Sequence, residues 1–447
     1  MACQCNNLYQ DKTYNLQHTT YNYFAIPSAW VILEYLRSHV MGGIGWNLLG
    51  YSQYKNLPII QIADIAGVWG ISFLIMLMNV AIYVAIKMAI KCYKKNPRLK
   101  IKGDATFKQE LEINPVIQTL FVLILFIATL TYGHIVIASP DAKGVGTKQS
   151  SIKISVVQGN IQQMFKWDDR FKNDIMNRYN DLTIKATKDK PDLIIWPETA
   201  VPGYLNYDKE LIQWIKKLIR RIKIPLLAGT PMISKEISGK SYNSAVLFSE
   251  KGSILGRYDK LHLVAFGEFI PFEKQFPFLR KLFPITGNFI SGKEYTVFGL
   301  RTTNYELRTT NFSVLICFED IFSGLVRDFV KRGADFMVNI TNDAWFGKTC
   351  AAYQHAACSV LRAVENRRPF IRSANTGLSC FIDKTGKIYK KVSENNNDLF
   401  IQGIKTAYIK IGKDRHLTFY TKYGDVSVLL CVFILFICAG KIFLTIK

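Results

Sequence analysis

Residues 192–200 read Asp192-Leu-Ile-Ile-Trp-Pro-Glu198-Thr-Ala200, an apolar run that a proline ends just before a carboxylate. Short runs of branched apolar residues that end in Gly, Pro or Asn predict buried strands. Similar runs recur at Ile152–Val157, Leu193–Trp196, Leu226–Gly229, Ala245–Phe248, Val314–Cys317, Phe336–Ile340 and Ser379–Ile382. Patterns with a period near 3.6 predict helices at Asp168–Thr187, Lys209–Ile222 and Gln354–Asn366. The alternation indicates an α/β fold, but periodicity alone does not distinguish two stacked sheets from one doubly wound sheet.

Three residues with distinct chemistry stand in segments of this kind. Glu198 follows the run just quoted, Lys260 lies in Gly256-Arg-Tyr-Asp-Lys260-Leu-His-Leu263, and Cys317 ends the strand-like run Phe312-Ser-Val-Leu-Ile-Cys317. A thiol, a carboxylate and an ammonium are the groups that covalent acyl transfer requires. Because they are 62 and then 57 residues apart, the fold must bring them together.

The residue types suggest a role for each group. Partial burial is expected to raise the pKa of Glu198 toward the range of a general base. Lys260, while charged, is better suited to stabilise a tetrahedral oxyanion, together with the backbone N–H of Phe318. The neighbouring Glu319 and Asp320 are expected to raise the pKa of the Cys317 thiol, with Lys260 opposing them. Three other cysteines, Cys350, Cys358 and Cys380, are predicted to be core residues.

Further strings in the chain carry a family resemblance. They are Gly159-Asn160, Lys166-Trp167-Asp168, Gly267-Glu268-Phe-Ile-Pro271, Asn342-Asp-Ala-Trp-Phe-Gly-Lys348 and Arg372-Ser-Ala-Asn-Thr-Gly377. With the three segments above they resemble the nitrilase (carbon–nitrogen hydrolase) superfamily, whose members use a Glu-Lys-Cys triad. Together with apolar segments on both sides, they look like the membrane branch of that superfamily, the apolipoprotein N-acyltransferases. The resemblance covers roughly residues 22–445 and implies a nitrilase-like α-β-β-α sandwich joined to a transmembrane helical part.

The resemblance also implies supporting residues. Glu268 would hold Lys260 in place and help proton transfer, and Glu319 would support the site beside the nucleophile; ion-pair scaffolding alone is the alternative for both. Trp167 would belong to the acyl-chain path, or be a core aromatic. The acyltransferases often have tyrosine after the cysteine, and Phe318 lacks that hydroxyl.

The implied reaction is acyl transfer in two steps. Cys317 would take an acyl chain from the sn-1 ester of a glycerophospholipid as a thioester. It would pass the chain to the N-terminal amine of S-diacylglyceryl-cysteine on an apolipoprotein. The chain would act as a monomer on two lipid substrates at the membrane, with no metal and no organic cofactor. One alternative is a membrane-tethered nitrilase-type amidohydrolase, and another is a non-enzymatic lipid-binding or scaffold protein.

Composition restricts the class of protein. With 447 residues and a hydrophobic fraction of 49%, the chain fits a mixture of membrane spans and a polar domain. The net charge of +23 is spread along the chain without a nucleic-acid motif, so anionic phospholipid headgroups explain it more economically. Nine cysteines form no CxxC pair or zinc spacing, and Cys3 and Cys5 stand in a polar N-terminus without the apolar core of a signal peptide.

Apolar segments predict the membrane part. Three are long enough to cross a bilayer, at about Ile62–Ile86, Val116–Ala138 and Val426–Leu444. A fourth candidate, Tyr23–Met41, contains Glu34 and Arg37 and could instead be an interfacial helix. The acyltransferases carry about six spans before the catalytic domain, so two or three here would mean a shortened variant or a reading frame without its upstream part.

Charge predicts the orientation. The loop at 87–108 carries Lys87, Lys91, Lys94, Lys95, Arg98, Lys100 and Lys102 before its first acid, Asp104, and is therefore expected in the cytoplasm. The expected order is a polar N-terminus (1–21), a transmembrane region (22–138), a catalytic domain (139–422) and a C-terminal transmembrane helix (423–447). The catalytic domain would lie on the periplasmic, outer face of a bacterial cytoplasmic membrane. The phenylalanine-rich stretch Phe266–Phe289 would be an apolar lip at that membrane, or else a buried plug.

Overall fold

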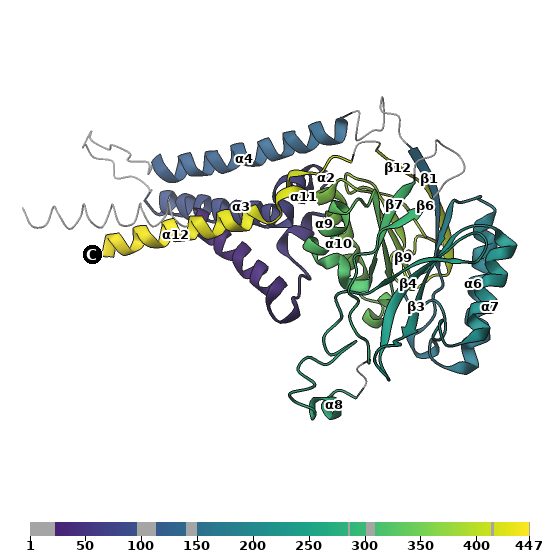
Figure 1. The fold of residues 1–447 in the computed structure, drawn as a ribbon. Helices are drawn as coiled ribbons and strands as arrows, with labels where there is room; N and C mark the ends of the chain where they lie inside the picture. Colours follow the sequence, from purple (N-terminus) through teal and green to yellow (C-terminus); the bar gives the residue numbers. More distant parts are fainter. Residues whose placement is uncertain are drawn as a thin grey trace, which may run out of the picture. The chain divides into compact units, whose positions relative to one another are not determined.

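The computed structural model describes residues 23–95, 113–139, 150–284, 287–300, 309–412 and 415–446 (Figure 1). The chain divides into two compact units. A helical unit comprises Met1–Ile137 and Tyr423–Lys447, and an α/β unit comprises Ala138–Lys422. The predicted polar segment 1–21 and residues 96–108 of the predicted basic loop lie outside the described residues.

Two six-stranded sheets form the α/β unit. The first has the order β12-β1-β2-β3-β4-β5 and the second the order β11-β10-β9-β8-β7-β6. The strands of the first sheet are β1 (Ser150–Gln158), β2 (Leu193–Ile195), β3 (Leu226–Ile233), β4 (Ser241–Phe248), β5 (Ile254–Asp259) and β12 (Gly403–Ile411). Those of the second are β6 (Phe298–Leu300), β7 (Thr310–Ile316), β8 (Phe336–Thr341), β9 (Phe370–Ala374), β10 (Cys380–Ile382) and β11 (Ile388–Lys391). Three neighbouring inner strands run parallel in each sheet: β1, β2 and β3 in the first, and β7, β8 and β9 in the second.

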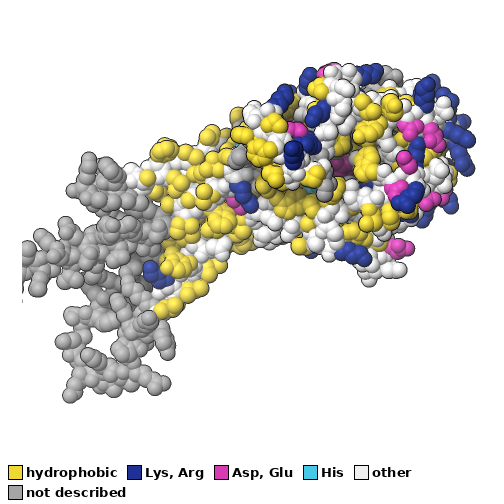
Figure 2. All heavy atoms as spheres, turned by 90° about the horizontal axis from the view of Figure 1, so that it is seen from below, with side chains coloured by type: hydrophobic (Ala, Val, Ile, Leu, Met, Phe, Trp, Pro, Cys, Tyr) yellow, Lys and Arg dark blue, Asp and Glu magenta, His cyan; other side chains and the backbone are white. Residues whose placement is uncertain are grey.

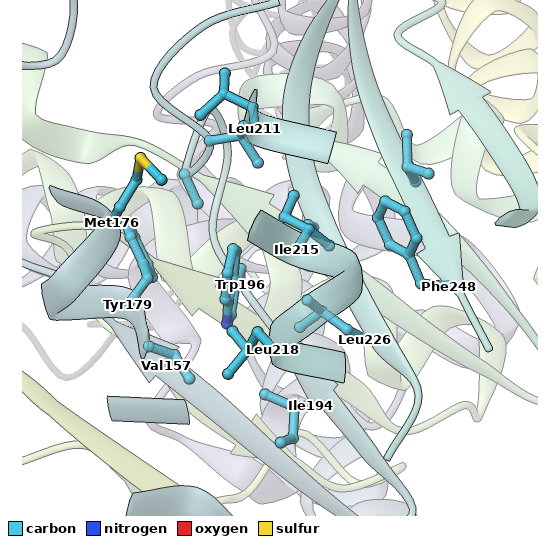
Figure 3. Close-up of a cluster of buried hydrophobic side chains, with 14 of the residues drawn as sticks. Val157, Met176, Tyr179, Ile194, Trp196, Leu211, Ile215, Leu218, Leu226 and Phe248 are labelled. Atoms are coloured by element: carbon cyan, nitrogen blue, oxygen red, sulfur yellow. The ribbon is translucent and has the colours of Figure 1, made fainter. Parts of the chain in front are cut away.

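Helices cover the outer face of each sheet (Figure 1). Helices α6 (Lys172–Thr187) and α7 (Lys209–Ile222) lie on the first sheet, and α9 (Ser323–Lys331) and α10 (Ala351–Asn366) lie on the second. The core between α6, α7 and the first sheet contains Trp196 beside Tyr179 (Figure 3), and the Trp196 ring also contacts the ring of Trp214. The predicted α-β-β-α sandwich is confirmed, and the alternative of a single doubly wound sheet is wrong.

The predicted strands and helices all exist, and several more were missed. Strand β7 ends at Ile316, one residue before the predicted end, because Cys317 already begins a 3-10 helix, η5 (Cys317–Ile321). The missed elements include the strands β5, β6, β9, β11 and β12 and the helix α9. Strand β12 was missed because its second half alternates buried Ala407, Ile409 and Ile411 with exposed Tyr408 and Lys410, so no continuous apolar run marks it.

The described part of the helical unit consists mainly of long helices. Residues 23–39 are helical, followed by α3 (Ala63–Lys95), α4 (Ile113–Ala138) and, from the C-terminal segment, α12 (Val426–Ile446). Among the described residues, two stretches are long and apolar enough to cross a membrane, Ala63–Ile90 and Val116–Ala138. The apolar part of α12, Val426–Gly440, is shorter. Hydrophobic side chains crowd the surface of these helices (Figure 2).

The charged residues of the helix at 23–39 are placed differently. Glu34 is buried, and its carboxylate accepts a hydrogen bond from the backbone N–H of Leu49 at 2.7 Å. Arg37 is exposed. The carboxylate therefore faces protein, as expected for an ionisable group in an apolar helix.

Candidate active site

Glu198 stands on a tightly built turn at the end of β2. The preceding Trp196 is fully buried and donates from its indole N–H to Thr183 at 2.9 Å. The following Thr199 has φ +46°, which is unusual for a β-branched residue. A Cβ on Gly229 of β3 would lie 2.3 Å from the Pro197 carbonyl oxygen, so only glycine lets β3 pass this closely. The packing of the two strands thus holds the Glu198 turn in a strained shape.

Asn243, on β4, connects Glu198 to the rest of the site. Its amide nitrogen donates to Glu198 Oε1 at 2.7 Å and to Glu268 Oε1 at 2.9 Å. Its backbone carbonyl accepts from the N–H of Lys260 at 2.9 Å. One asparagine therefore fixes the distance between two carboxylates and the start of the lysine segment. Sequence reasoning missed Asn243, since a lone asparagine in a strand-like run gives no chemical signal.

Lys260 is buried and paired. Its Nζ lies 2.8 Å from Glu268 Oε2 and 3.0 Å from Oε1, and Glu268 Oε2 also accepts from the Val264 N–H at 2.9 Å. Burial by itself lowers the pKa of Lys260, but the charges of nearby acidic groups, Glu268 first among them, outweigh it, and the pKa is raised. Lys260 therefore keeps its proton at neutral pH. Its Nζ also lies 5.2 Å from the centre of the Phe318 ring.

Cys317 follows β7 directly and has φ +56°, in the left-handed region. Such a conformation costs a non-glycine residue about 1–2 kcal/mol, so neighbouring groups must hold it. Two side chains donate to its carbonyl oxygen: Asn339 Nδ2 at 2.7 Å and His355 Nε2 at 3.3 Å. The strained turn presents the thiol at the carboxyl end of the strand.

The pKa of the Cys317 thiol is raised well above its usual value. Burial is the largest cause, followed by the charge of Glu198, while Lys260 acts in the opposite direction. The neighbouring Glu319 and Asp320, which the sequence predicts to raise it, are not among its largest causes. Both carboxylates are occupied elsewhere: Asp320 pairs with His355 and Arg372, and Glu319 is held by Tyr258 and backbone N–H groups. The thiol is therefore protonated at rest and needs a base when it reacts.

Glu319 is fully buried beneath this turn. Its Oε1 accepts from the N–H groups of Leu261 and His262 at 2.7 and 3.0 Å, and Oε2 accepts from the Ile316 N–H at 2.8 Å. Tyr258 Oη donates to both oxygens at 2.9 Å. Burial raises the pKa of Glu319 to about 7, while these donors and the Lys260 charge lower it. Glu319 thus ties the lysine segment to the cysteine segment.

A second lysine, Lys166, lies in the site. Its buried Nζ donates to the Glu198 carbonyl oxygen at 3.1 Å and to Thr199 Oγ1 at 2.8 Å. Burial lowers the pKa of Lys166 to about 8, against the charges of Glu198 and Cys317. The motif string Lys166-Trp167-Asp168 could have identified Lys166 from the sequence, but only Trp167 was predicted to have a role. Trp167 itself is 50% exposed.

Asparagines from three of the motif segments are joined by hydrogen bonds. Asn375 donates from Nδ2 to Asn342 Oδ1 at 2.8 Å, and its backbone carbonyl accepts from the Asn160 N–H. A Cβ on Gly377 would collide with Asp343 Oδ2 at 1.9 Å, so this loop packs directly on the next. Hydrogen bonds therefore join segments that are more than 200 residues apart.

The remaining cysteine predictions have mixed outcomes. Cys358 and Cys380 are buried, as predicted. Cys350 is exposed, so the prediction of a core residue is wrong. It occupies the N-cap position of α10 at the surface and does not lie on the buried face of the helix. Among the described residues, no cluster of three His, Cys, Asp or Glu side chains could hold a metal ion.

The phenylalanine-rich stretch is not a plug. Phe266, Phe272, Phe276, Phe278 and Phe283 are between 39% and 60% exposed. The short helix α8 (Leu279–Leu282) within the stretch has no buried residue. The stretch is an apolar surface of the α/β unit, which is what a contact with lipid requires.

Comparison with known families gives two matches. Residues 153–411 match the carbon-nitrogen hydrolases, and residues 8–81 match the apolipoprotein N-acyltransferase N-terminal domain. The apolipoprotein N-acyltransferase of Geobacter metallireducens is 38% identical over 410 residues, which cover 91% of this chain and 72% of that protein. The apolipoprotein N-acyltransferase of Bradyrhizobium diazoefficiens is 30% identical, with 91% of this chain and 71% of that protein covered.

Solved structures of the same superfamily are also similar. A Saccharomyces cerevisiae member of branch 10 of the nitrilase superfamily has a TM-score of 0.44 and 19% sequence identity, covering 60% of this chain and 92% of that one. A carbon-nitrogen hydrolase from Helicobacter pylori has a TM-score of 0.43 and 17% identity, covering 58% and 89%.

Proposed function

This chain belongs to the apolipoprotein N-acyltransferases, a branch of the carbon-nitrogen hydrolases, and we propose that it acylates lipoproteins through a thioester on Cys317. The observation that supports this most directly is the convergence of Glu198, Lys260 and Glu268 on the strained cysteine turn, through Asn243 and through charge. We propose that the chain acts as a monomer, since one copy carries all of these residues.

In the first step Glu198 acts as the base. Its pKa is raised, with burial as the largest cause, so it is suited to accept a proton from the Cys317 thiol. The thiolate sulfur attacks the sn-1 ester carbonyl carbon of a glycerophospholipid. The resulting oxyanion is stabilised by the Lys260 ammonium and the Phe318 N–H. When the intermediate collapses, the ester C–O bond breaks, and protonated Glu198 returns the proton to the leaving glycerol oxygen. The products are a thioester and a lysophospholipid.

In the second step the acceptor amine is the nucleophile, and the Cys317 sulfur is the leaving group. The neutral amine of an S-diacylglyceryl-cysteine attacks the thioester carbonyl, and Glu198 takes the amine proton. The same two donors stabilise the second oxyanion. Collapse breaks the C–S bond, and the Cys317 sulfur regains the proton from Glu198. One nucleophile thus serves both substrates in turn, which requires a ping-pong order.

Two features support lipid substrates. The apolar helices of the helical unit give a membrane context, and the exposed phenylalanines of Phe266–Phe283 offer apolar contact for an acyl chain or a lipid surface. The lysine-rich segment 87–108 was predicted as a loop, but its first nine residues belong to helix α3. Its charge supports an outward-facing catalytic unit by the positive-inside rule. Diacylglyceryl lipoproteins emerge on that face.

Mass spectrometry of the purified full chain tests the proposal. Mixed with a phospholipid that carries a palmitoyl chain at sn-1, the protein should gain a palmitoyl adduct on Cys317. Addition of an S-diacylglyceryl-cysteine peptide should discharge it as N-palmitoyl peptide. The Cys317→Ala variant should form no adduct, whereas Cys350→Ala and Cys358→Ala should form it normally. Release of free fatty acid without N-acyl peptide would favour the amidohydrolase, and an adduct on another cysteine would refute the assignment of the nucleophile.

A further inference from the structure

A buried network of charged groups lies behind the cysteine turn. It consists of Asp320 on η5, Asp343 after β8, His355 on α10 and Arg372 on β9, all of them 0–1% exposed. Two carboxylates and two cations give a network with no net charge. None of these groups has a part in the two-step reaction described above, although Asp320 is only three residues from Cys317.

His355 is the centre of this network. Its Nδ1 lies 2.8 Å from Asp343 Oδ1, and its Nε2 lies 2.9 Å from Asp320 Oδ1. An ionised carboxylate only accepts hydrogen bonds, so both ring nitrogens must carry a proton. Burial by itself lowers the pKa of His355, but Asp320 and Asp343 outweigh it and raise the pKa to about 9. His355 is therefore an imidazolium at neutral pH.

This cation also reaches the backbone of the nucleophile. Nε2 lies 3.3 Å from the Cys317 carbonyl oxygen, a second and longer branch of its bond to Asp320. Asn339 donates to the same oxygen at 2.7 Å from the neighbouring strand β8. Among the described groups, Asn339 Oδ1 has no hydrogen-bond partner, so burying this amide costs stability that its one bond only partly offsets. Both side chains converge on a single carbonyl group.

The Cys317 carbonyl belongs to the same peptide unit as the Phe318 N–H. Because a trans peptide is planar, its C=O and N–H groups point in opposite directions, and fixing the oxygen fixes the direction of the N–H. A cationic donor on the oxygen also strengthens the N–H as a donor, through polarisation of the peptide.

We propose that His355 and Asn339 are positioning residues that hold and polarise the Cys317–Phe318 peptide, so that the Phe318 N–H serves as an oxyanion donor. The inference rests on the proposed function, since it concerns the oxyanion of that reaction. It assigns the buried network an electrostatic part in catalysis beyond its contribution to stability.

The test separates oxyanion stabilisation from the reactivity of the thiol. Acylation of Cys317 by a phospholipid passes through an oxyanion, whereas alkylation of the same thiol by iodoacetamide does not. The rates of both reactions are measured on the full chain in detergent micelles, for the wild type, Asn339→Leu and His355→Gln. Loss of one oxyanion donor typically lowers a rate about a hundredfold or more, so partial misorientation should slow acylation about tenfold to a hundredfold. Alkylation should stay within about threefold of wild type.

Controls cover unfolding and general disturbance of the core. Met337→Leu alters β8, and Cys358→Ala alters α10, without touching the Cys317 carbonyl; both should leave the two rates nearly unchanged. Since His355→Gln removes one of the two cations beside Asp343 and leaves the network with a net negative charge, the double variant His355→Gln/Asp343→Asn restores the charge balance and should remain slow in acylation. Asn339→Leu changes no charge at all.

Two results would overturn the inference: unchanged acylation in Asn339→Leu and His355→Gln, or an equal fall of acylation and alkylation in both. Absence of any adduct on the wild type would instead refute the proposed function. The two failures are therefore distinguishable.

Discussion

Lys166 donates a hydrogen bond to the backbone carbonyl of Glu198 at 3.1 Å, so a buried cation holds the main chain of the residue proposed as the base. The same Nζ binds Thr199 Oγ1, and Thr199 has the strained positive φ that gives the turn its shape. A buried cation likewise contacts the Cys317 carbonyl, in that case His355. In both strained turns of the site, a positively charged side chain thus donates a hydrogen bond to a backbone carbonyl oxygen.

Lys166→Met should slow acylation at pH 7 by about tenfold, because the Glu198 turn loses two hydrogen bonds worth about 1.5–3 kcal/mol each when a charged group is involved. The pKa of Lys166 is about 8, so the wild type itself loses this charge as the pH rises through that value. The ratio of wild-type to variant rates should therefore fall between pH 7 and pH 9. A ratio that stays constant over this range would contradict the role given to the charge.

The same lysine should affect stability. Its folded pKa, about 8, is below the ordinary value of 10.5, so between these two values the unfolded chain binds more protons at this position than the folded chain. Stability contributed by this position therefore increases as the pH rises from about 8 to 10.5 and is lowest below 8. In Lys166→Met this gradient should disappear. Melting temperatures of both proteins across this range measure the difference.

Lys260→Ala should reduce acylation by about a hundredfold or more, the usual effect of removing one oxyanion donor. Lys260→Arg should rescue little of this, since a planar guanidinium does not fit a site built for a compact ammonium between Glu268 and the Phe318 ring. Single-turnover acylation monitored by mass spectrometry provides the rates. A nearly normal rate for the arginine variant would mean that only a distant positive field matters.

Glu268→Gln should change the pH dependence of acylation. Glu268 is the largest of the charges that raise the pKa of Lys260 against the effect of burial, so its loss should lower that pKa. The protonated, active form of Lys260 would then be lost as the pH rises, and the variant should be slowest relative to wild type at high pH. Rates measured from pH 6 to pH 10 test this, and a parallel loss at every pH would point to misplacement of Lys260 instead.

The catalytic unit is predicted to lie on the outer face of the membrane, where the proposed acceptor occurs. A reporter that fluoresces only in the cytoplasm should light up when fused after Lys95 and remain dark when fused after Gly144, because the lysine-rich loop holds residues 87–108 inside. The inverse pattern would place Cys317 in the cytoplasm, where the amidohydrolase becomes the better interpretation.

Sequence patterns predicted most of the strands around the site. Runs such as Leu193–Trp196 and Ala245–Phe248 are continuous and apolar because these parts of the strands are buried on both faces, and such a run can be recognised from adjacent residues. Strand β12 could not be found this way, since only its pairing with β1, some 250 residues earlier, makes it a strand. Cys350 was misplaced for a related reason: whether a cysteine beside a helix is buried depends on which side of the helix packs.

The sequence by itself determined that Glu198 and Cys317 stand at or near strand ends and that Lys260 lies in a motif segment, because local periodicity and the residues that end each run are encoded within a few positions. Only the tertiary structure decided that the strands form two sheets, and that Asn243, Lys166 and His355 hold those three residues. Hydrogen bonds between segments far apart in the chain depend on register and packing, which arise only when the whole chain has collapsed around one core.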